Sequence, residues 1–177
     1  ATTIAGDREA LRVMSCVIFC ILFGVIGFID DFAKVAKKQN EGLKPMQKIV
    51  LQVVAAVLWL AAMYWFGDRS TVIDLSFVKF DISFFYYPLM ILVILYLTNA
   101  VNLTDGVDGL CGTVTLVAML IFTLICSKLQ METYTLFTMA LAGGCLGFLV
   151  WNLHPAKCFM GDTGSMYLGA AVTAVGL

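Results

Sequence analysis

The chain has 177 residues, of which 61% are hydrophobic and only 13% are charged, and its mean hydropathy is +0.94. Soluble domains are about half apolar and a quarter charged, so this apolar excess excludes a soluble globular protein. A net charge of −1 provides no broad basic surface, which argues against nucleic acid as a partner. We therefore expect a protein whose solvent is mostly the lipid bilayer.

Apolar segments of membrane-spanning length follow one another along the chain. A spanning helix needs about 20 mostly apolar residues. Five segments satisfy this criterion and a sixth begins near the end of the sequence: Leu11–Ile29, Met46–Phe66, Tyr86–Leu103, Leu110–Ser127, Thr135–Leu153 and Gly164–Leu177. The predicted fold class is an all-α polytopic membrane protein, with residues 1–177 forming a single, partial transmembrane bundle of about six helices. Since no initiator Met is present and the last apolar segment is cut short, we expect a longer protein.

The segment between the second and third helices has a different composition. Residues 71–75 and 77–83 are rich in β-branched and aromatic residues with partial alternation, which predicts a short extracytoplasmic β-hairpin within residues 67–85. Alternation of the helices then places residues 30–48, 104–109 and 154–163 together on the opposite side. Lysines gather in the first of these segments, so the positive-inside rule predicts that this side is cytoplasmic.

Acidic residues recur where the helices end on that side. Asp30 and Asp31 close the first helix, Asp105 and Asp108 follow the third, and Asp162 follows the fifth. Five carboxylates around one site would repel one another unless some were protonated or a cation were bound. Hard oxygen ligands and substrate phosphates suit Mg²⁺, so the pattern predicts a metal-assisted phosphate site. The alternative is that each acid only caps a helix or solvates an interface.

Two polar segments add to this site. Asn99, Asn102 and Asp105 end the third helix, and the glycines that follow allow close ligand approach; a glycine-rich turn between helices is the alternative. In the second segment, Asp162 opens a helix whose N–H groups would bind a phosphate, or Asp162 is simply its N-cap. His154 is the only histidine, which favours a structural role over a metal site.

The basic residues of the first segment have two readings. Lys34 and Lys38 lie three and seven residues after Asp31, so a continued helix would place them near its face. This spacing favours both for phosphate contact, although the lysine cluster could instead face lipid head groups.

Three motifs resemble a known family in both order and spacing. Residues 27–32 (GFIDDF) with 42–48 (GLKPMQK), 99–110 (NAVNLTDGVDGL) and 154–165 (HPAKCFMGDTGS) resemble the bacterial phospho-N-acetylmuramoyl-pentapeptide-transferases. The aspartate motifs are shared by the wider superfamily of polyprenyl-phosphate N-acetylhexosamine-1-phosphate transferases, which stays the alternative. The Asn-Leu-Thr-Asp and His-Pro-Ala-Lys motifs are more similar to those of the muramoyl-pentapeptide branch than to those of the other superfamily members.

The resemblance implies transfer of phospho-MurNAc-pentapeptide from UDP-MurNAc-pentapeptide to undecaprenyl phosphate, giving lipid I and UMP with Mg²⁺ as cofactor. It implies a multi-pass protein of the bacterial inner membrane with its active site on the cytoplasmic face, and it allows a homodimer. The family's earlier helices and histidine-rich loop lie outside this sequence, so we expect this chain alone to be inactive.

The resemblance also assigns roles by matching position. Asp162 would be a Mg²⁺ ligand, and the catalytic set would be completed by Asp30 and Asp31, which would remove a proton or position the lipid phosphate. The lysines would contact phosphates, the asparagines would support the site, Asp105 and Asp108 would line the nucleotide pocket, and Phe159 would stack on uracil. The implied substrate-binding set is Lys34, Lys38, Lys48, Asn99, Asn102, Asp105, Asp108, Asn152 and Phe159.

The mechanism and the functional class leave alternatives. Direct attack by the lipid phosphate is the preferred hypothesis, and an aspartyl-phosphate intermediate is the other route. An ion-coupled transporter is the rival function, since intramembrane acids often mark ion pathways. It predicts acids spread through the membrane depth, whereas these acids cluster at helix ends.

Overall fold

The computed structural model describes residues 2–38, 42–65, 71–74 and 79–177. The described residues form helices α1 (Thr2–Lys37), α2 (Pro45–Trp65), α3 (Tyr86–Thr104), α4 (Leu110–Lys128), α5 (Glu132–Asn152) and α6 (Gly161–Gly176). Helices α1 to α5 are each long and apolar enough to cross a membrane. The predicted all-α, multi-pass membrane bundle is therefore confirmed.

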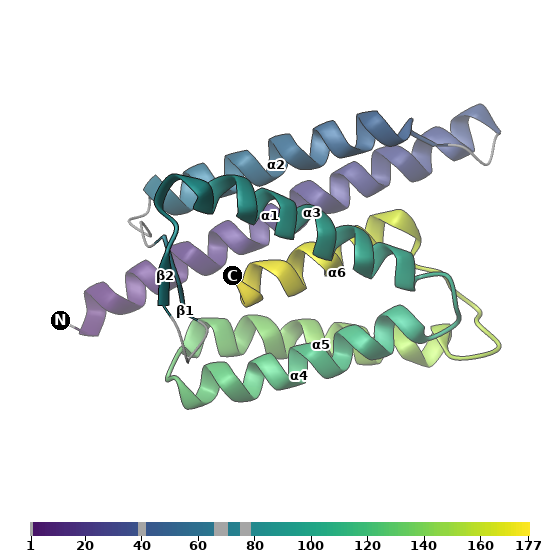
Figure 1. Ribbon diagram of the computed structural model, residues 1–177. Helices are drawn as coiled ribbons and strands as arrows, with labels where there is room; N and C mark the ends of the chain where they lie inside the picture. Colours follow the sequence, from purple (N-terminus) through teal and green to yellow (C-terminus); the bar gives the residue numbers. More distant parts are fainter. Residues whose placement is uncertain (1, 39–41, 66–70, 75–78) are drawn as a thin grey trace.

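The bundle is organised around the contact between its first and last helices. Helix α6 packs along α1 and α3, and α2 lies on the other side of α1 (Figure 1). Small residues of α6 are buried here, including Ala170 and Ala171, and they allow the backbones to approach closely. The closest approach is at Gly27 of α1, where an added Cβ would clash with the carbonyl oxygen of Asp162 and lie 2.7 Å from the Cα of Thr163.

Helices α4 and α5 form a second, hairpin-like pair. Buried residues recur every three or four positions on both helices, so each presents one stripe to the other. Within this contact the Thr123 hydroxyl donates to the Thr138 hydroxyl at 2.8 Å. The pair is tied to α1 by Glu9, whose Oε1 accepts hydrogen bonds from the backbone N–H groups of Thr133 at 2.7 Å and Tyr134 at 3.2 Å.

Two predicted helix boundaries are wrong in a way that matters for the site. Helix α1 does not end at Ile29 but continues to Lys37, and α6 begins at Gly161 instead of Gly164. A hydropathy criterion ends a segment where charge begins, yet hydrogen bonding within the helix continues beyond the apolar stretch. Asp30, Asp31 and Lys34 therefore lie on a helix and not in a loop.

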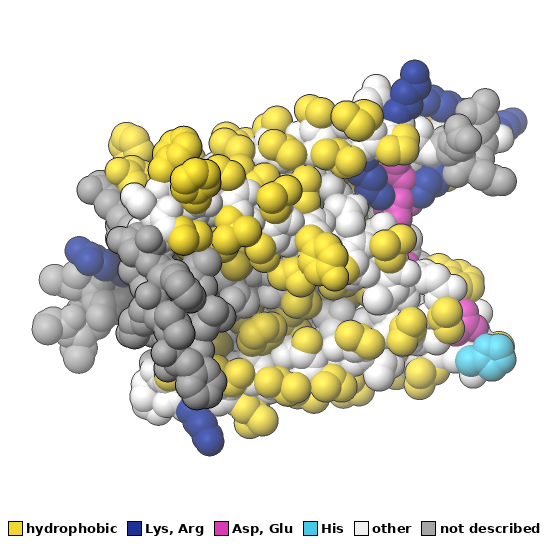
Figure 2. All heavy atoms as spheres, in the orientation of Figure 1, with side chains coloured by type: hydrophobic (Ala, Val, Ile, Leu, Met, Phe, Trp, Pro, Cys, Tyr) yellow, Lys and Arg dark blue, Asp and Glu magenta, His cyan; other side chains and the backbone are white. Residues whose placement is uncertain are grey.

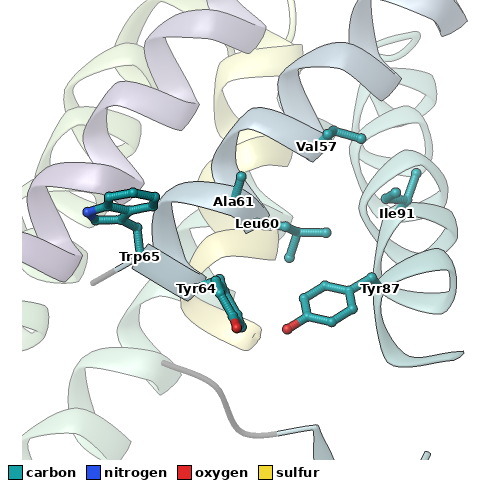
Figure 3. A pocket seen from close by; sticks show the side chains of 7 residues that line it. All are labelled: Val57, Leu60, Ala61, Tyr64, Trp65, Tyr87 and Ile91. Carbon is teal, nitrogen blue, oxygen red and sulfur yellow. The ribbon is translucent and has the colours of Figure 1, made fainter. Parts of the chain in front are cut away.

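The end of the bundle away from these acids carries the predicted β structure. Strands β1 (Val72–Asp74) and β2 (Lys79–Asp81) pair antiparallel, with Val72 opposite Asp81. Residues 66–70 and 75–78 of the predicted hairpin lie outside the described residues, and its extracytoplasmic position stays a prediction. Near this end an apolar pocket of about 580 Å³ lies between α2 and α3, with Leu60 facing into it and the rings of Tyr64 and Tyr87 turned toward each other (Figure 3).

Candidate functional site: an acidic cluster with two lysines

Three carboxylates from two helices meet at one end of the bundle. The C-terminal ends of α1, α3 and α5 and the starts of α2, α4 and α6 lie at this end (Figure 1). Asp30 and Asp31 of α1 and Asp162 of α6 each place one carboxylate oxygen within 4.8 Å of the others. Figure 2 shows acidic and basic side chains gathered at this end, whereas apolar side chains cover the length of the bundle.

Lys34 lies among the three carboxylates. Its Nζ is 2.8 Å from Oδ2 of Asp30, 3.3 Å from Oδ1 of Asp31 and 2.7 Å from Oδ2 of Asp162. The first two distances follow from helical geometry, because residues three and four apart share a face of α1. A single ammonium group thus offsets part of the repulsion among three like charges.

Asp31 fixes the start of α6. Its Oδ2 accepts hydrogen bonds from the backbone N–H of Thr163 at 2.9 Å and from the Thr163 hydroxyl at 2.8 Å, and its Oδ1 accepts one from the backbone N–H of Asp162 at 3.3 Å. These N–H groups have no partner within α6, so Asp31 caps that helix from a distance of more than a hundred residues in sequence. Gly161 has a positive φ of 65°, and an added Cβ there would lie 2.8 Å from Oδ2 of Asp31.

Asp162 is held by both α2 and α3. Lys48 of α2 places its Nζ 3.2 Å from Oδ2, and Nδ2 of Asn102 in α3 donates to Oδ1 at 2.9 Å. Burial favours the neutral acid, but hydrogen bonds from Lys34 and Asn102 and the charge of Lys48 outweigh burial. The pKa of the Asp162 carboxyl is therefore well below its usual range.

Asp30 is the most buried acid of the cluster, at 4% exposure. Its Oδ1 accepts a hydrogen bond from the backbone N–H of Leu43 at 2.8 Å, which ties α1 to the segment that precedes α2. An added Cβ on Gly42 would lie 2.6 Å from that carboxylate oxygen, so the segment passes directly over the acid. This contact positions Lys48 at the start of α2 for its own contact with Asp162.

Asp105 lies just beyond α3 and is unlike the other acids. Burial raises the pKa of its carboxyl, and the negative charges of Asp162 and Asp31 raise it further. The Asp105 carboxyl is therefore harder to ionise than that of an exposed aspartate.

Two connections, residues 105–109 and 153–160, are joined to each other beside the cluster. Oδ2 of Asp108 accepts from the backbone N–H of Ala156 at 3.1 Å and lies 3.0 Å from Nδ1 of His154. These two hydrogen bonds lower the pKa of the Asp108 carboxyl. Asn152 is 3% exposed, and its side chain accepts from the N–H of Gly109 at 3.0 Å and donates to the carbonyl of Cys158 at 2.8 Å.

The remaining residues predicted for the site lie around this centre. Asn99 is one turn deeper in α3 than Asn102 and pairs with Gln52. Phe159 is 70% exposed and belongs to the second of the two joined connections. Lys38 lies just past the end of α1 with a positive φ of 51°, and among the described residues it forms no ion pair with the acidic cluster.

Four residues of the site were not predicted from the sequence. Thr163 and Ser165 bind Asp31 and Asn102, respectively, and Gln52 binds Asn99. Gln52 carried a usable signal, because it is the one strongly polar side chain after Lys48 in its apolar segment and lies four residues beyond that lysine. Leu43 acts through its backbone N–H, for which the sequence has no signal.

Comparison with known proteins places this geometry in a family. The model of the family described as "Glycosyl transferase family 4" matches residues 13–177. Similar proteins named phospho-N-acetylmuramoyl-pentapeptide-transferase include one from Heliobacterium modesticaldum, 45% identical over 157 residues, which are 88% of this chain and 49% of that protein. One from Clostridioides difficile is 44% identical over 167 residues, 91% of this chain and 51% of that protein.

A third relative extends the match along nearly the whole chain. The protein of the same name from Halalkalibacterium halodurans is 42% identical over 169 residues, which are 95% of this chain and 52% of that protein. The chain thus spans about half the length of the curated relatives it matches. Because the family match includes the acidic cluster, both of its lysines and the joined connections, the chain belongs to glycosyl transferase family 4.

Proposed function

We propose that the full-length protein transfers phospho-MurNAc-pentapeptide from UDP-MurNAc-pentapeptide to undecaprenyl phosphate and releases UMP. An oxygen of the lipid phosphate forms a bond to the phosphorus that carries the sugar. The bond from that phosphorus to the oxygen bridging the diphosphate breaks, and UMP leaves with the bridging oxygen. The observation that supports this reaction best is the convergence of Asp30, Asp31 and Asp162 with Lys34 and Lys48 at one end of the bundle.

We propose Mg²⁺ as the cofactor, because the donor set fits it. Three carboxylate oxygens within 4.8 Å of one another are hard ligands, and a cationic nitrogen already lies among them in Lys34. Asp162 would be a ligand, with Asp30 and Asp31 beside it. When bound, the ion would neutralise negative charge on the diphosphate.

The chain's own residues would orient the reactants and compensate charge. Lys34 and Lys48 would contact phosphate oxygens once these compete with the carboxylates for the ammonium groups. A phosphomonoester has a second pKa of about 6, so the attacking lipid phosphate is largely dianionic at neutral pH and a strong base is unnecessary. Asp30 would accept any residual proton, and this route of direct attack needs no aspartyl-phosphate.

The two joined connections would form the nucleotide side of the site. Asp108 is fixed by Ala156 and His154, and the exposed ring of Phe159 is available to stack on a flat base. Asp105, whose carboxyl is partly buried and feels the charges of Asp162 and Asp31, would lie between this side and the acidic cluster.

We further propose that the protein resides in the bacterial inner membrane with this site on the cytoplasmic face. Five lysines lie within residues 34–48, the segment at the end of the bundle that carries the acidic cluster: Lys34, Lys37, Lys38, Lys44 and Lys48. This clustering agrees with the positive-inside rule. The homodimer stays a prediction. An ion-coupled transporter is less well supported, because the acids of the cluster lie at helix ends and not along the membrane depth.

The test uses the full-length protein in detergent or liposomes. Radiolabelled UDP-MurNAc-pentapeptide, undecaprenyl phosphate and Mg²⁺ should give label that extracts into organic solvent, and UMP in equal amount. UDP-GlcNAc in place of the first donor distinguishes this branch from its relatives. Lipid-soluble label from UDP-GlcNAc alone would reassign the donor, and none from either donor would contradict the proposed reaction.

A further inference from the structure

Gln52 of α2 and Asn99 of α3 form a reciprocal pair of side-chain amides. Nε2 of Gln52 donates to Oδ1 of Asn99 at 3.2 Å, and Nδ2 of Asn99 donates to Oε1 of Gln52 at 2.9 Å. Nδ2 of Asn99 also donates to the carbonyl of Leu95 at 2.7 Å. Gln52 has no exposed surface. A buried amide without partners is costly, so this pair favours one relative placement of the two helices.

The pair lies one helical turn from the acidic cluster on both helices. Lys48 precedes Gln52 by four residues, and Asn102 follows Asn99 by three, so each shares a helix face with its amide. Lys48 and Asn102 contact different oxygens of the same carboxylate, Oδ2 and Oδ1 of Asp162. The axial register of α2 against α3 therefore decides whether both contacts form together.

Apolar packing alone would leave this register less well defined. Near the pair, α2 presents Ala55 and Ala56 to the bundle interior, and further along Trp59 stacks on Phe19 of α1 with ring centroids 4.5 Å apart. Contacts between apolar surfaces are non-directional, whereas two amide hydrogen bonds have a narrow range of geometry.

We propose that Gln52, paired with Asn99, is a positioning residue that sets the register of α2 against α3 and thereby holds Lys48 on Asp162, opposite Asn102. This inference rests on the proposed function for its kinetic readout. Among the described residues, the Gln52 side chain hydrogen-bonds to Asn99 and to no member of the acidic cluster, so it acts through Lys48. Its loss should therefore have the same consequence as loss of Lys48, and the two losses should not add.

The experiment is a double-mutant cycle in the full-length protein. Gln52→Leu should lower kcat by roughly 10- to 100-fold with a change in donor KM of less than about threefold. In a Lys48→Met background, Gln52→Leu should change kcat by less than about twofold, because its target is already gone. Thr138→Val removes a buried hydroxyl pair between α4 and α5 and should leave kcat per folded molecule unchanged.

Exchanging the two amides provides the rescue. Gln52→Asn should shorten the pair and lower both kcat and the unfolding midpoint, and Gln52→Asn combined with Asn99→Gln should recover at least half of the lost midpoint, since the summed length of the side chains is restored. If the pair were purely structural, its loss would lower the unfolding midpoint of every variant, but the effect of Gln52→Leu on kcat would not depend on the presence of Lys48.

The outcomes separate the two proposals. Equal kcat for Gln52→Leu and wild type, or losses from Gln52→Leu and Lys48→Met that multiply, would overturn the positioning role while the transferase assignment stands. An inactive wild-type protein would contradict the proposed function instead. In that case, the same cycle measured on unfolding midpoints still decides the inference: coupling between Gln52→Leu and Lys48→Met supports it, and additive shifts overturn it.

Discussion

The Nζ of Lys34 lies 2.7 Å from Oδ2 of Asp162, although 128 residues separate them in the sequence. The same ammonium group contacts Asp30 and Asp31 on its own helix. One side chain thus links the last turns of α1 to the first turn of α6, and it is the centre of charge compensation in the site.

Replacing Lys34 by Met should expose the repulsion that it offsets. Without the ammonium group, three carboxylates remain within 4.8 Å of one another. We expect a loss of about 1–3 kcal/mol in the free energy of unfolding, discounted for the partial exposure of Lys34, and a fall in turnover of about 100-fold. Thermal unfolding and the transferase assay of the full-length protein measure the two effects.

Mg²⁺ should partly restore the stability of that variant. Because a bound cation replaces the missing charge, it should raise the unfolding midpoint of Lys34→Met more than that of the wild type. Lys37→Met, three residues along the same helix and exposed, is the matched control and should lie within about 0.5 kcal/mol of wild type. Indistinguishable behaviour of the two lysine variants would remove Lys34 from the cluster.

Gly27→Ala should separate α1 from the start of α6. The added methyl group would meet backbone atoms of Asp162 and Thr163, which cannot move aside as a flexible side chain can. We expect a loss of about 3 kcal/mol in the free energy of unfolding. Gly143→Ala in α5, with nothing within 4 Å of the added Cβ, should be neutral or stabilising by up to about 1 kcal/mol. Equal unfolding midpoints for the two variants would contradict the close approach.

Asp105→Asn should increase stability and decrease activity. The pKa of Asp105 is raised in the folded state, so its ionisation opposes folding at every pH above the unfolded value of about 3.9. The variant should therefore unfold at a higher temperature than wild type at pH 7 without divalent cations, and the difference should shrink as the pH falls toward 4. Lower turnover at pH 7 would accompany it if Asp105 contacts the nucleotide.

Glu9→Ala should weaken the junction between α1 and α5. Its carboxylate accepts two N–H groups at the start of α5, and losing such a cap costs about 0.5–2 kcal/mol. Glu9→Gln keeps a neutral acceptor and should cost less. Glu132→Gln, at an exposed acid in the first turn of the same helix, should cost at most about 0.5 kcal/mol. Hydrogen exchange of the Thr133 and Tyr134 amides in these variants measures the cap.

The apolar segments and the grouping of their ends could be predicted from the sequence, because the bilayer sets the length of a spanning helix. Whether α1 continues past Asp31 to Lys37 stayed open in the sequence, since charged residues that leave the hydrocarbon no longer carry a hydropathy signal. This extension brings Lys34 onto the face of Asp30 and Asp31. The spacing of Lys34 after Asp31 agrees with this arrangement, but the ion pair of Lys34 with Asp162 depends on the packing of α1 against α6.

The candidate site was only partly accessible to sequence reasoning. Residues with ionisable groups stand out in an apolar chain, so Asp30, Asp31 and Asp162 could be singled out. Their partners act through backbone N–H groups, as Leu43 does for Asp30, or through side chains that resemble ordinary helix residues, as Thr163 does for Asp31. Such contacts depend on the tertiary packing of α1 against α6.

We propose that a divalent cation binds at Asp162, beside Asp30 and Asp31. Anomalous diffraction from crystals of the full-length protein soaked in Mn²⁺ tests it most directly. We expect an anomalous peak within coordination distance of the Asp162 carboxylate, beside Asp30 and Asp31, with the Lys34 ammonium group displaced from its position among them. A peak bound by other residues, or no peak while the three carboxylates lie apart, would contradict it.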